Sequence, residues 1–396
     1  MAAQAQNLEP GLPLRLCMDA RMLVTAGGTG VSSYARELQR AHRTISEAHS
    51  LLSDRPVFDG PAPSPLGRAG RWLRALMPGI RQARASATGE NLLIAPDVFR
   101  VAQIYFDVHR RPLRVGVDGP PGIMHWTYPV PLMLAGWRNL YTVHDVIPLL
   151  HPELTHIDGA RYQRLLDQLA RYANRFIAVS ETARREIIQA TDCAPDFVVD
   201  CSLSVDATQP KIGNLPPPLT RGNFLLICGT VEKRKNVGRL LQAYRQSEVA
   251  MPLVIAGPDG WGASDIAGLI ESTPGVIRLP YLDRHTVRIL VSQARALVMP
   301  SLAEGFGLPV AEAMALGTAV ATSDHGALAE TAGGAALAID PHDIAALAAG
   351  LRRLAMDDAF CASLAAAGRR NAERFTPARF AERLTRAYAE VMSKPT

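Results

Sequence analysis

Residues 300–324 read PSLAEGFGLPVAEAMALGTAVATSD, and this stretch decides the fold of the second half of the chain. An apolar run ends just before it, a glycine-rich loop opens it, residues 310–316 have helical spacing, and residues 319–322 are apolar again. A strand, a loop, a helix and a second strand in this order are typical of a parallel sheet that helices cover. The stretch therefore predicts an α/β domain.

The same alternation continues on both sides of this stretch. In the second half we expect strands at residues 223–228, 252–256, 275–279, 296–299 and 319–322. In the first half we expect strands at residues 14–19, 91–95, 122–125, 140–144 and 175–179, and helices at 32–41 and after Ser180. Each half is thus predicted to be a doubly wound, Rossmann-like unit that binds ligands where its strands end.

The length of the chain points to two domains. It has 396 residues, whereas a single core stops growing at roughly 250–300 residues. Residues 209–222, QPKIGNLPPPLTRG, are rich in proline and glycine, which is typical of a linker. We expect one domain over residues 1–212 and a second over 213–375. Residues 377–392 have the spacing of an amphipathic helix with Thr376 as its cap.

Composition excludes several classes of protein. Hydrophobic residues make up 48% and charged residues 20% of the chain, which excludes disorder and coiled coil as descriptions of the whole. We find no apolar run of about 18 residues that would span a membrane and no secretory signal. The five cysteines lack any CxxC pair, which argues against zinc or a disulfide framework and favours the cytoplasm.

The basic residues are mostly arginines. Only four of the 42 are lysines, and the net charge is +5. This balance suits anionic partners such as phosphates or an acidic membrane surface. No basic helix has the spacing of a DNA-binding motif, so we expect no nucleic-acid partner.

The most specific motif is Glu304 and Glu312 with seven residues between them. Between them lie Gly305, Phe306, Gly307 and Leu308, and then Pro309 in the first helical turn. Glycines before a helix leave free backbone N–H groups at its positive end, which suits a phosphate. Because carboxylates repel phosphate, we expect the two glutamates to accept hydrogen bonds from sugar or ribose hydroxyls. The alternative is that Glu312 pairs on the helix surface and the glycines only permit tight packing.

Two further loops follow strands of the second half. Gly229 opens a loop that carries Arg234 and Lys235, either as cations aimed at a ligand or as a solvated charge run. Gly257 opens the sequence GPDGW, which suits a nucleotide base, although Trp261 has simple packing as its alternative.

In the first half, His144 follows a predicted strand and is a candidate for the site, with a purely structural histidine as the alternative. His125, with Trp126 and Tyr128, is a candidate for lining an acceptor pocket. Gly28 and Gly30, in AGGTGV, permit a close approach to phosphate. Ser33 stands where a dinucleotide fingerprint needs its third glycine.

Residues 68–84, RAGRWLRALMPGIRQAR, combine apolar and basic faces at helical spacing. Such a helix is typical of contact with an acidic bilayer. Pro78 and Gly79 would break it, and an ordinary surface helix is the alternative.

Together these stretches resemble the retaining, nucleotide-sugar-dependent glycosyltransferases of family 4, which have the GT-B fold. EGFGLPVAEAMALGTAVATSD resembles their Glu-x7-Glu signature, and YTVHDVIPLLHPE and ICGTVEKRKNVGRLLQAY resemble their histidine segment and Arg-Lys-Asn loop. The resemblance implies two Rossmann-like domains that face a central cleft, with a C-terminal helix in 376–396 that rejoins the first. It implies Arg234 and Lys235 on the donor diphosphate and His144 donating to a sugar hydroxyl.

The resemblance also implies a function. We expect a retaining transferase that moves a hexose, first of all mannose from GDP-mannose, to a saccharide or lipid-linked saccharide in bacterial surface polysaccharide synthesis. UDP-glucose, UDP-N-acetylglucosamine and dTDP-rhamnose remain open as donors. No Asp-x-Asp triplet is present to hold a metal, so we expect neither metal nor cofactor. We expect a cytoplasmic protein, with contact to the inner face of the membrane through residues 68–84 as an open alternative.

Two rival classes remain. The AGGTGV loop allows a nicotinamide-dependent oxidoreductase, which the missing third glycine disfavours. A non-catalytic sugar-nucleotide binding protein is the other, and Glu304, Glu312 and Lys235 argue against it.

Overall fold

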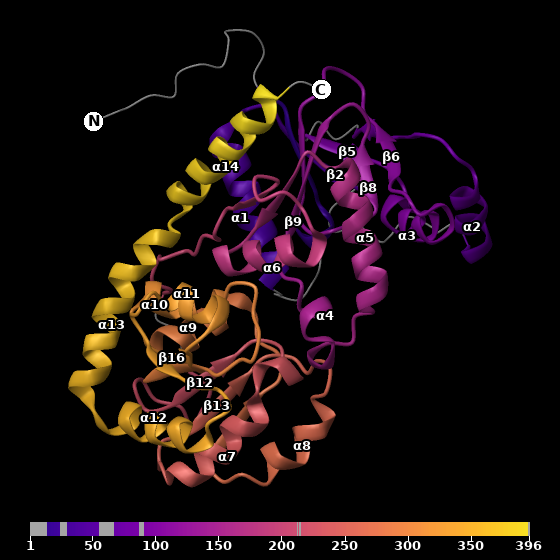
Figure 1. The fold of residues 1–396 in the computed structure, drawn as a ribbon. Helices are drawn as coiled ribbons and strands as arrows, with labels where there is room; N and C mark the ends of the chain where they lie inside the picture. The colour runs from indigo at the N-terminus through magenta and orange to yellow at the C-terminus, as the bar shows by residue number, and fades with distance from the viewer. Residues whose placement is uncertain are drawn as a thin grey trace, which may run out of the picture.

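A computed structural model describes residues 14–23, 30–54, 67–86, 91–211, 213 and 215–394. Two α/β units lie one above the other, and the last two helices run along both of them (Figure 1). In the described part of the chain, no helix combines the length and the apolar character needed to cross a membrane.

The first unit is built on an eight-stranded sheet with the order β11-β10-β9-β7-β1-β2-β5-β4. Its strands are β1 (Leu16–Asp19), β2 (His49–Ser53), β4 (Arg84–Ala85), β5 (Leu92–Ile94), β7 (Ile123–Trp126), β9 (Arg138–Val143), β10 (Arg175–Ala178) and β11 (Val198–Asp200). All neighbours pair in parallel except β4 with β5. A small second sheet joins β3 (Arg81–Gln82), β6 (Leu113–Gly116) and β8 (Leu132–Leu134).

The helices of this unit connect the parallel strands. They are α1 (Gly30–Ile45), α2 (Arg68–Leu76), α3 (Val98–His109), α4 (Ile147–Leu150), α5 (Gly159–Tyr172) and α6 (Glu181–Thr191). Ser180 caps α6 as the sequence predicts, because its Oγ accepts a hydrogen bond from the N–H of Ala183 at 3.0 Å.

The second unit has a six-stranded, fully parallel sheet with the order β14-β13-β12-β15-β16-β17. Its strands are β12 (Leu225–Cys228), β13 (Leu253–Ala256), β14 (Val276–Leu279), β15 (Ala296–Met299), β16 (Ala319–Ser323) and β17 (Leu337–Ile339). Its helices are α7 (Val237–Ser247), α8 (Ser264–Glu271), α9 (Arg284–Gln293), α10 (Leu308–Leu316), α11 (Gly326–Ala332), α12 (Ile344–Met356) and α13 (Asp358–Ala372). The strand order reverses between β12 and β15, where a doubly wound sheet binds its ligands.

The C-terminal helix α14 (Pro377–Ser393) leaves the second unit and packs on α1 of the first. Tyr388 of α14 is fully buried, and its hydroxyl lies 2.7 Å from Nε2 of His42 and 2.7 Å from Nδ1 of His125. The chain therefore crosses between the units twice, once before β12 and once after α13.

The predicted strands are confirmed within two residues, but the sequence did not predict the short strands β3, β4, β6, β8, β11 and β17. The strand β2 was also not predicted, because its five residues HSLLS carry a short apolar core between polar ends. The predicted helix over 68–84 ends at Leu76, and the chain then turns extended in β3 and β4. Pro78 and Gly79 explain the break, since proline removes a helical hydrogen bond.

Candidate active site

Two loops of the second unit meet where its strand order reverses. The loop after β12 contains a 3-10 turn, Lys233–Lys235, and the loop after β15 carries Glu304. Because β12 and β15 are neighbours in the sheet, their carboxyl ends bring these side chains together.

The side chains form one buried charge cluster. Lys235 Nζ lies 2.5 Å from one oxygen of Glu304, and Arg234 pairs with the other. Arg234 also lies 2.6 Å from a carboxylate oxygen of Glu232. The side chain of Lys235 is only 7% exposed. A buried charge without a partner is costly, so each member of the cluster holds the others in place.

The cluster keeps Glu304 ionised. Burial alone would raise its pKa, but Arg234 and Lys235 lower it to about 2. Burial would likewise lower the pKa of Arg234, but the carboxylates of Glu304 and Glu232 raise it above its ordinary value. The sequence predicted these three residues as separate contacts to a ligand, whereas the structure joins them directly to one another.

The helix α10 begins beside this cluster with an open N-terminus. Its N-cap is Gly307 with φ +99°, and no side chain caps it. The left-handed conformation favours glycine, so the sequence GFGLP fixes where the helix starts. The uncapped N–H groups and the helix dipole make this end positive. The Arg234–Lys235–Glu304 cluster and this helix end together offer an anion both fixed dipoles and cations.

Gly305 brings the two units into contact at the same point. A Cβ atom on Gly305 would lie 2.0 Å from the backbone oxygen of His144, which no real side chain tolerates. Its own carbonyl accepts a hydrogen bond of 2.7 Å from Ser180 Oγ in the first unit. The loop that carries Glu304 is therefore pressed against the carboxyl end of β9.

His144 lies at that strand end with a defined tautomer. Its Nε2 is 2.9 Å from the backbone oxygen of Thr127, which can only accept, so Nε2 carries the proton. Burial lowers the pKa of His144 to about 4, so the ring is neutral at pH 7. The remaining Nδ1 is an acceptor, which differs from the expected donation to a sugar hydroxyl. The ring of Tyr34 holds His144 edge-on at 5.0 Å.

Glu312 has an arginine of the neighbouring helix as its partner within the protein. One of its oxygens lies 3.4 Å from Arg284 of α9, and the same guanidinium donates to Ser33 Oγ of α1 at 2.9 Å. Burial raises the pKa of Glu312, although Arg284 opposes the rise. Glu312 thus ties the second unit to the first through Arg284.

Gly229 and Gly257 bring two loops together beside the cluster. Both have positive φ, at +120° and +138°, and a Cβ on Gly257 would lie 2.1 Å from the backbone oxygen of Gly229. Trp261 remains 37% exposed, and Lys233 Nζ lies 5.4 Å from its ring centre. The indole is therefore a surface platform that carries a cation, not part of the core.

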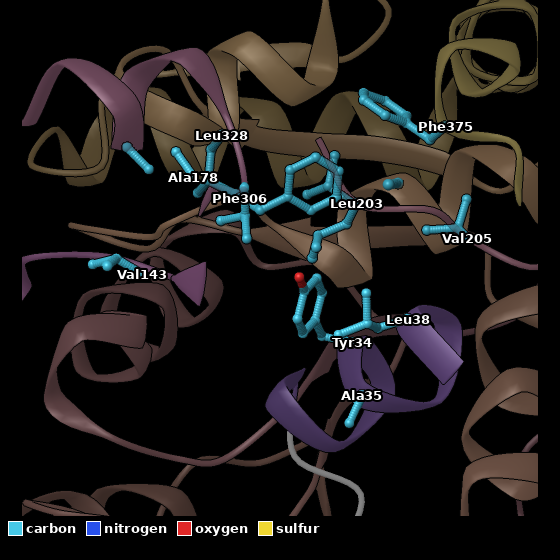
Figure 2. Packing of buried hydrophobic residues seen from close by; sticks show 14 of the residues in the cluster. Tyr34, Ala35, Leu38, Val143, Ala178, Leu203, Val205, Phe306, Leu328 and Phe375 are labelled. Atoms are coloured by element: carbon cyan, nitrogen blue, oxygen red, sulfur yellow. The ribbon is translucent and has the colours of Figure 1, made fainter. Parts of the chain in front are cut away.

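Other predicted residues lie elsewhere. The ring of Phe306 packs edge-on against Phe375 at 5.2 Å in the core, so only its backbone reaches the helix end (Figure 2). Leu308 is the first residue of α10. Gly30 begins α1 with open space around it, and Gly28 lies outside the described residues.

The predicted acceptor pocket around His125 is wrong. His125 and Trp126 are fully buried inside β7. His125 bonds to Thr142 Oγ1 at 2.8 Å and to the hydroxyl of Tyr388, and burial holds its pKa well below the ordinary value. It is a core histidine.

Sequence reasoning missed two residues that join the units. Glu330 of α11 accepts hydrogen bonds from the N–H groups of Glu181 and Thr182, at 2.8 and 2.7 Å, in the first turn of α6. Arg284 bridges α9 to α1, as described above. Neither residue stands in a recognisable sequence motif. Glu330 does lie on a helix that directly follows a strand, α11 after β16, and this is the position from which the site residues were predicted.

One further carboxylate was missed at the end of β1. Asp19 is fully buried and accepts hydrogen bonds from Thr127 N at 2.6 Å and from Thr127 Oγ1 at 2.8 Å. Burial raises its pKa to about 6. Its signal in the sequence was the rule used for His144, a polar residue at a strand's carboxyl end.

Comparison with known proteins shows what the chain is similar to. Residues 216–371 match the family described as glycosyl transferases group 1. The O-antigen chain mannosyltransferase B of Escherichia coli is 33% identical over 211 residues, which are 50% of this chain and 55% of that protein. The chain thus spans about half the length of this relative.

Two solved structures share the architecture of the whole chain. Sucrose-phosphate synthase from Thermosynechococcus elongatus has a TM-score of 0.70 at 17% identity, over 96% of this chain and 99% of that one. Anabaena HepE, solved in complex with UDP-glucose, has a TM-score of 0.65 at 15% identity, again over 96% and 99%. At such identities they show the fold alone. The fold is GT-B, as the sequence predicted, and residues 216–371 are similar to the glycosyl transferases group 1 family.

Proposed function

We propose that the protein is a retaining glycosyltransferase that transfers a hexose from a nucleoside diphosphate sugar to a hydroxyl. The observation that carries the proposal is the buried Arg234–Lys235–Glu304 cluster beside the uncapped N-terminus of α10, pressed through Gly305 against His144. A diphosphate is the ligand that such a combination of cations and helix end suits best.

The chemistry follows from where charge develops. As the bond between the sugar's anomeric carbon and the diphosphate breaks, the leaving oxygens gain negative charge. Arg234, Lys235 and the end of α10 therefore stabilise the transition state, in which this charge develops, more strongly than the ground state. The acceptor hydroxyl forms its bond to the anomeric carbon on the same face, and its proton passes to the leaving diphosphate. Glu304 holds the two cations in place throughout.

The neutral ring of His144 gives the sugar a polar contact from the first unit. Its Nδ1 accepts a hydrogen bond from a sugar hydroxyl, because Nε2 is already committed to Thr127. The loop with Gly305 keeps this ring close to the diphosphate site.

We propose GDP-mannose as the first donor to test. The similarity to a protein named an O-antigen chain mannosyltransferase supports mannose and polysaccharide synthesis. UDP-glucose, UDP-N-acetylglucosamine and dTDP-rhamnose are the alternatives, and UDP-glucose is the sugar nucleotide of the HepE complex. Trp261, with Lys233 over its ring, is the proposed platform for the base.

The proposal includes a reaction without metal. Two fixed cations and a helix end supply the positive charge that Mg²⁺ or Mn²⁺ supplies in other sugar transferases. We expect turnover in EDTA to match turnover without it, and loss of turnover that Mn²⁺ restores would contradict this.

We further propose a lipid-linked saccharide as acceptor and a place at the cytoplasmic face of the membrane, which residues 68–84 contact. The support is the set of apolar side chains that α2 exposes, described below.

A thermal-stability panel tests the function. A ligand that binds only the folded state raises the melting temperature by mass action. We expect GDP-mannose to raise it, and to do so much less in Lys235→Ala than in Lys211→Ala, a matched lysine in the linker. Stabilisation by NADH and by no sugar nucleotide would overturn the proposal in favour of an oxidoreductase. Stabilisation without any sugar transfer to a membrane fraction would favour a binding protein.

A further inference from the structure

A cavity of about 400 Å³ lies beneath α2, apart from the site described above. Within the described residues, three arginines line it: Arg74 from α2, Arg81 from β3 and Arg84 from β4. Its remaining walls are mostly apolar and come from β5, α3 and β6, with Ile94 and Val98 among them. The cavity thus combines cations with a hydrocarbon lining.

Among the described residues, little acidic charge faces the arginines of this region. Residues 67–86 contain five arginines and neither aspartate nor glutamate. Arg71 lies 3.5 Å from Asp97, but among the described residues Arg74 and Arg84 have no acidic partner within salt-bridge distance. Arg81 donates from Nη2 to the backbone oxygens of Arg74 and Met77, but its buried Nε has no hydrogen-bond partner in the described part of the chain. The described residues thus leave Arg74, Arg84 and the Nε of Arg81 as donors for an anion.

The outer side of α2 is apolar. Its exposed large side chains, with those of the turn after it, are Trp72 (49% exposed), Leu73 (64%), Leu76 (50%), Met77 (56%) and Ile80 (44%). The helix lies at the edge of the first unit, away from the second (Figure 1). An apolar patch of this size on a basic helix is typical of a segment that rests in a bilayer interface.

We propose that this cavity binds the phosphate group of a membrane lipid while the outer face of α2 inserts among the acyl chains. Guanidinium groups suit phosphate because their planar fork donates two parallel hydrogen bonds to it. The apolar walls then receive the carbons next to the phosphate. This sharpens the membrane contact proposed above into a site of defined chemistry, and it does not depend on sugar transfer.

The position of the cavity relates it to the candidate active site. Ala95 and Pro96, which line it, follow the carboxyl end of β5, and His144 follows the carboxyl end of β9. These strands run parallel in one sheet, four steps apart in the order β9-β7-β1-β2-β5. At about 4.8 Å a step, the two sites lie about 19 Å apart along one edge. A lipid held there presents a saccharide attached to it along the edge toward His144.

Vesicle binding tests the proposal. We compare vesicles of phosphatidylcholine alone with vesicles that also contain phosphatidic acid, and measure cosedimentation of the full chain. Two variants remove equal charge: Arg74→Gln with Arg84→Gln in the cavity, and Arg110→Gln with Arg114→Gln on exposed positions outside its lining. A hydrogen bond between charged groups contributes more binding free energy than diffuse attraction of one arginine to an acidic surface. We therefore expect the cavity variant to weaken vesicle binding at least about tenfold more than the control variant does.

Two further measurements separate the sources of phosphate. Inorganic phosphate, at constant ionic strength, should release the wild type from the vesicles, because it competes for the cavity. Leu73→Gln should weaken vesicle binding but keep the part of the melting-temperature shift with inorganic phosphate that the Arg74→Gln, Arg84→Gln variant loses, since that part reports on the cavity and not on the anion site at α10. Equal losses in the two double variants would overturn the proposal in favour of diffuse charge. A phosphate-induced shift that depends on Arg74 and Arg84, without binding of vesicles, would overturn it in favour of a soluble anion.

These readouts are independent of the proposed transferase activity. Failure of every sugar nucleotide with normal vesicle binding would reject the function and leave the lipid site standing. Unchanged melting temperatures of the two double variants, which we expect because Arg74 and Arg84 make no ion pair in the described structure, confirm that they fold.

Discussion

Two helix N-termini lie close to the contact between the domains, and they differ in whether side chains cap their N–H groups. The first turn of α6 is filled by protein: Ser180 caps it from within, and Glu330 reaches across from the second domain to accept from Glu181 N and Thr182 N. The first turn of α10 starts at Gly307 with no side-chain cap. Both ends are positive, but only α10 leaves its N–H groups to a ligand.

The difference teaches how one physical device serves two purposes. At α6 the carboxylate of Glu330, from the other domain, takes the place that an anionic ligand would take, so this helix end joins the two domains. At α10 the carboxylate of the preceding loop, Glu304, is turned onto Arg234 and Lys235 and so does not fill the helix end. The predictions below test whether α10 is open for a ligand and α6 closed for structure.

The largest effect is expected at the open end. Lys235→Ala removes a cation beside α10 and leaves Glu304 with one partner instead of two. We expect turnover to fall by about 10²–10³-fold, the range for the loss of a group that stabilises charge in the transition state. Steady-state kinetics with GDP-mannose measure it, with Lys211→Ala as control. Rates of both variants near wild type would contradict the assignment of α10 as the ligand end.

The contact between the two ends comes next. Gly305→Ala places a methyl group 2.0 Å from the backbone oxygen of His144, so the domains cannot approach as closely. A displacement of about 1 Å costs up to ~10²-fold in rate. We expect turnover to fall by about 10²-fold while the donor still raises the melting temperature. Gly268→Ala is the matched control, because a Cβ there meets nothing within 4 Å. Loss of donor stabilisation together with turnover would mean that the variant disturbs the donor site itself.

These residues differ in how far the sequence predicted them. Gly307 and Lys235 stand in loops that connect a strand to the next helix. Such loops can be recognised from nearby residues, so the positions of both were predicted. Glu330 lies 148 residues from Thr182, and Arg284 lies 251 residues from Ser33, so no local pattern joins either pair. Only the packing of the two domains creates those contacts.

The error in the prediction for His125 has a more local cause. The predicted strand ended at His125, which would put its side chain at the ligand edge, but β7 continues to Trp126. Because side chains alternate along a strand and only its end reaches the ligand edge, an error of one residue moved His125 from the core to the site. Phe306 was misplaced for a related reason: its backbone belongs to the loop, but its ring fills the core against Phe375.

A smaller effect is expected at the closed end. Glu330→Ala removes the acceptor from the N–H groups of Glu181 and Thr182 but leaves the cap by Ser180. Loss of a helix cap costs about 1 kcal/mol, or roughly a fivefold change in an equilibrium. We expect kcat/KM to fall by about fivefold through weaker closure, with Glu271→Gln, an exposed glutamate, as control. A loss as large as that of Lys235→Ala would mean that Glu330 acts in the chemistry and that the two helix ends do not differ as described.

The smallest effect is expected in how the free energy of unfolding depends on pH. In the folded protein Arg234 and Lys235 hold the pKa of Glu304 at about 2, below its ordinary value of 4.5. A carboxylate with a depressed pKa contributes stability that is present above pH 4.5 and is lost as the pH falls toward 2. Chemical denaturation of wild type and Glu304→Gln should therefore differ by a constant free energy of unfolding above pH 4.5. The difference should shrink between pH 4.5 and 2, because the ion pairs exist only while Glu304 is charged. A difference that instead shrinks near neutral pH would show that the cluster does not keep Glu304 ionised, and the argument that this carboxylate is bound to its cations and leaves α10 open would fail with it.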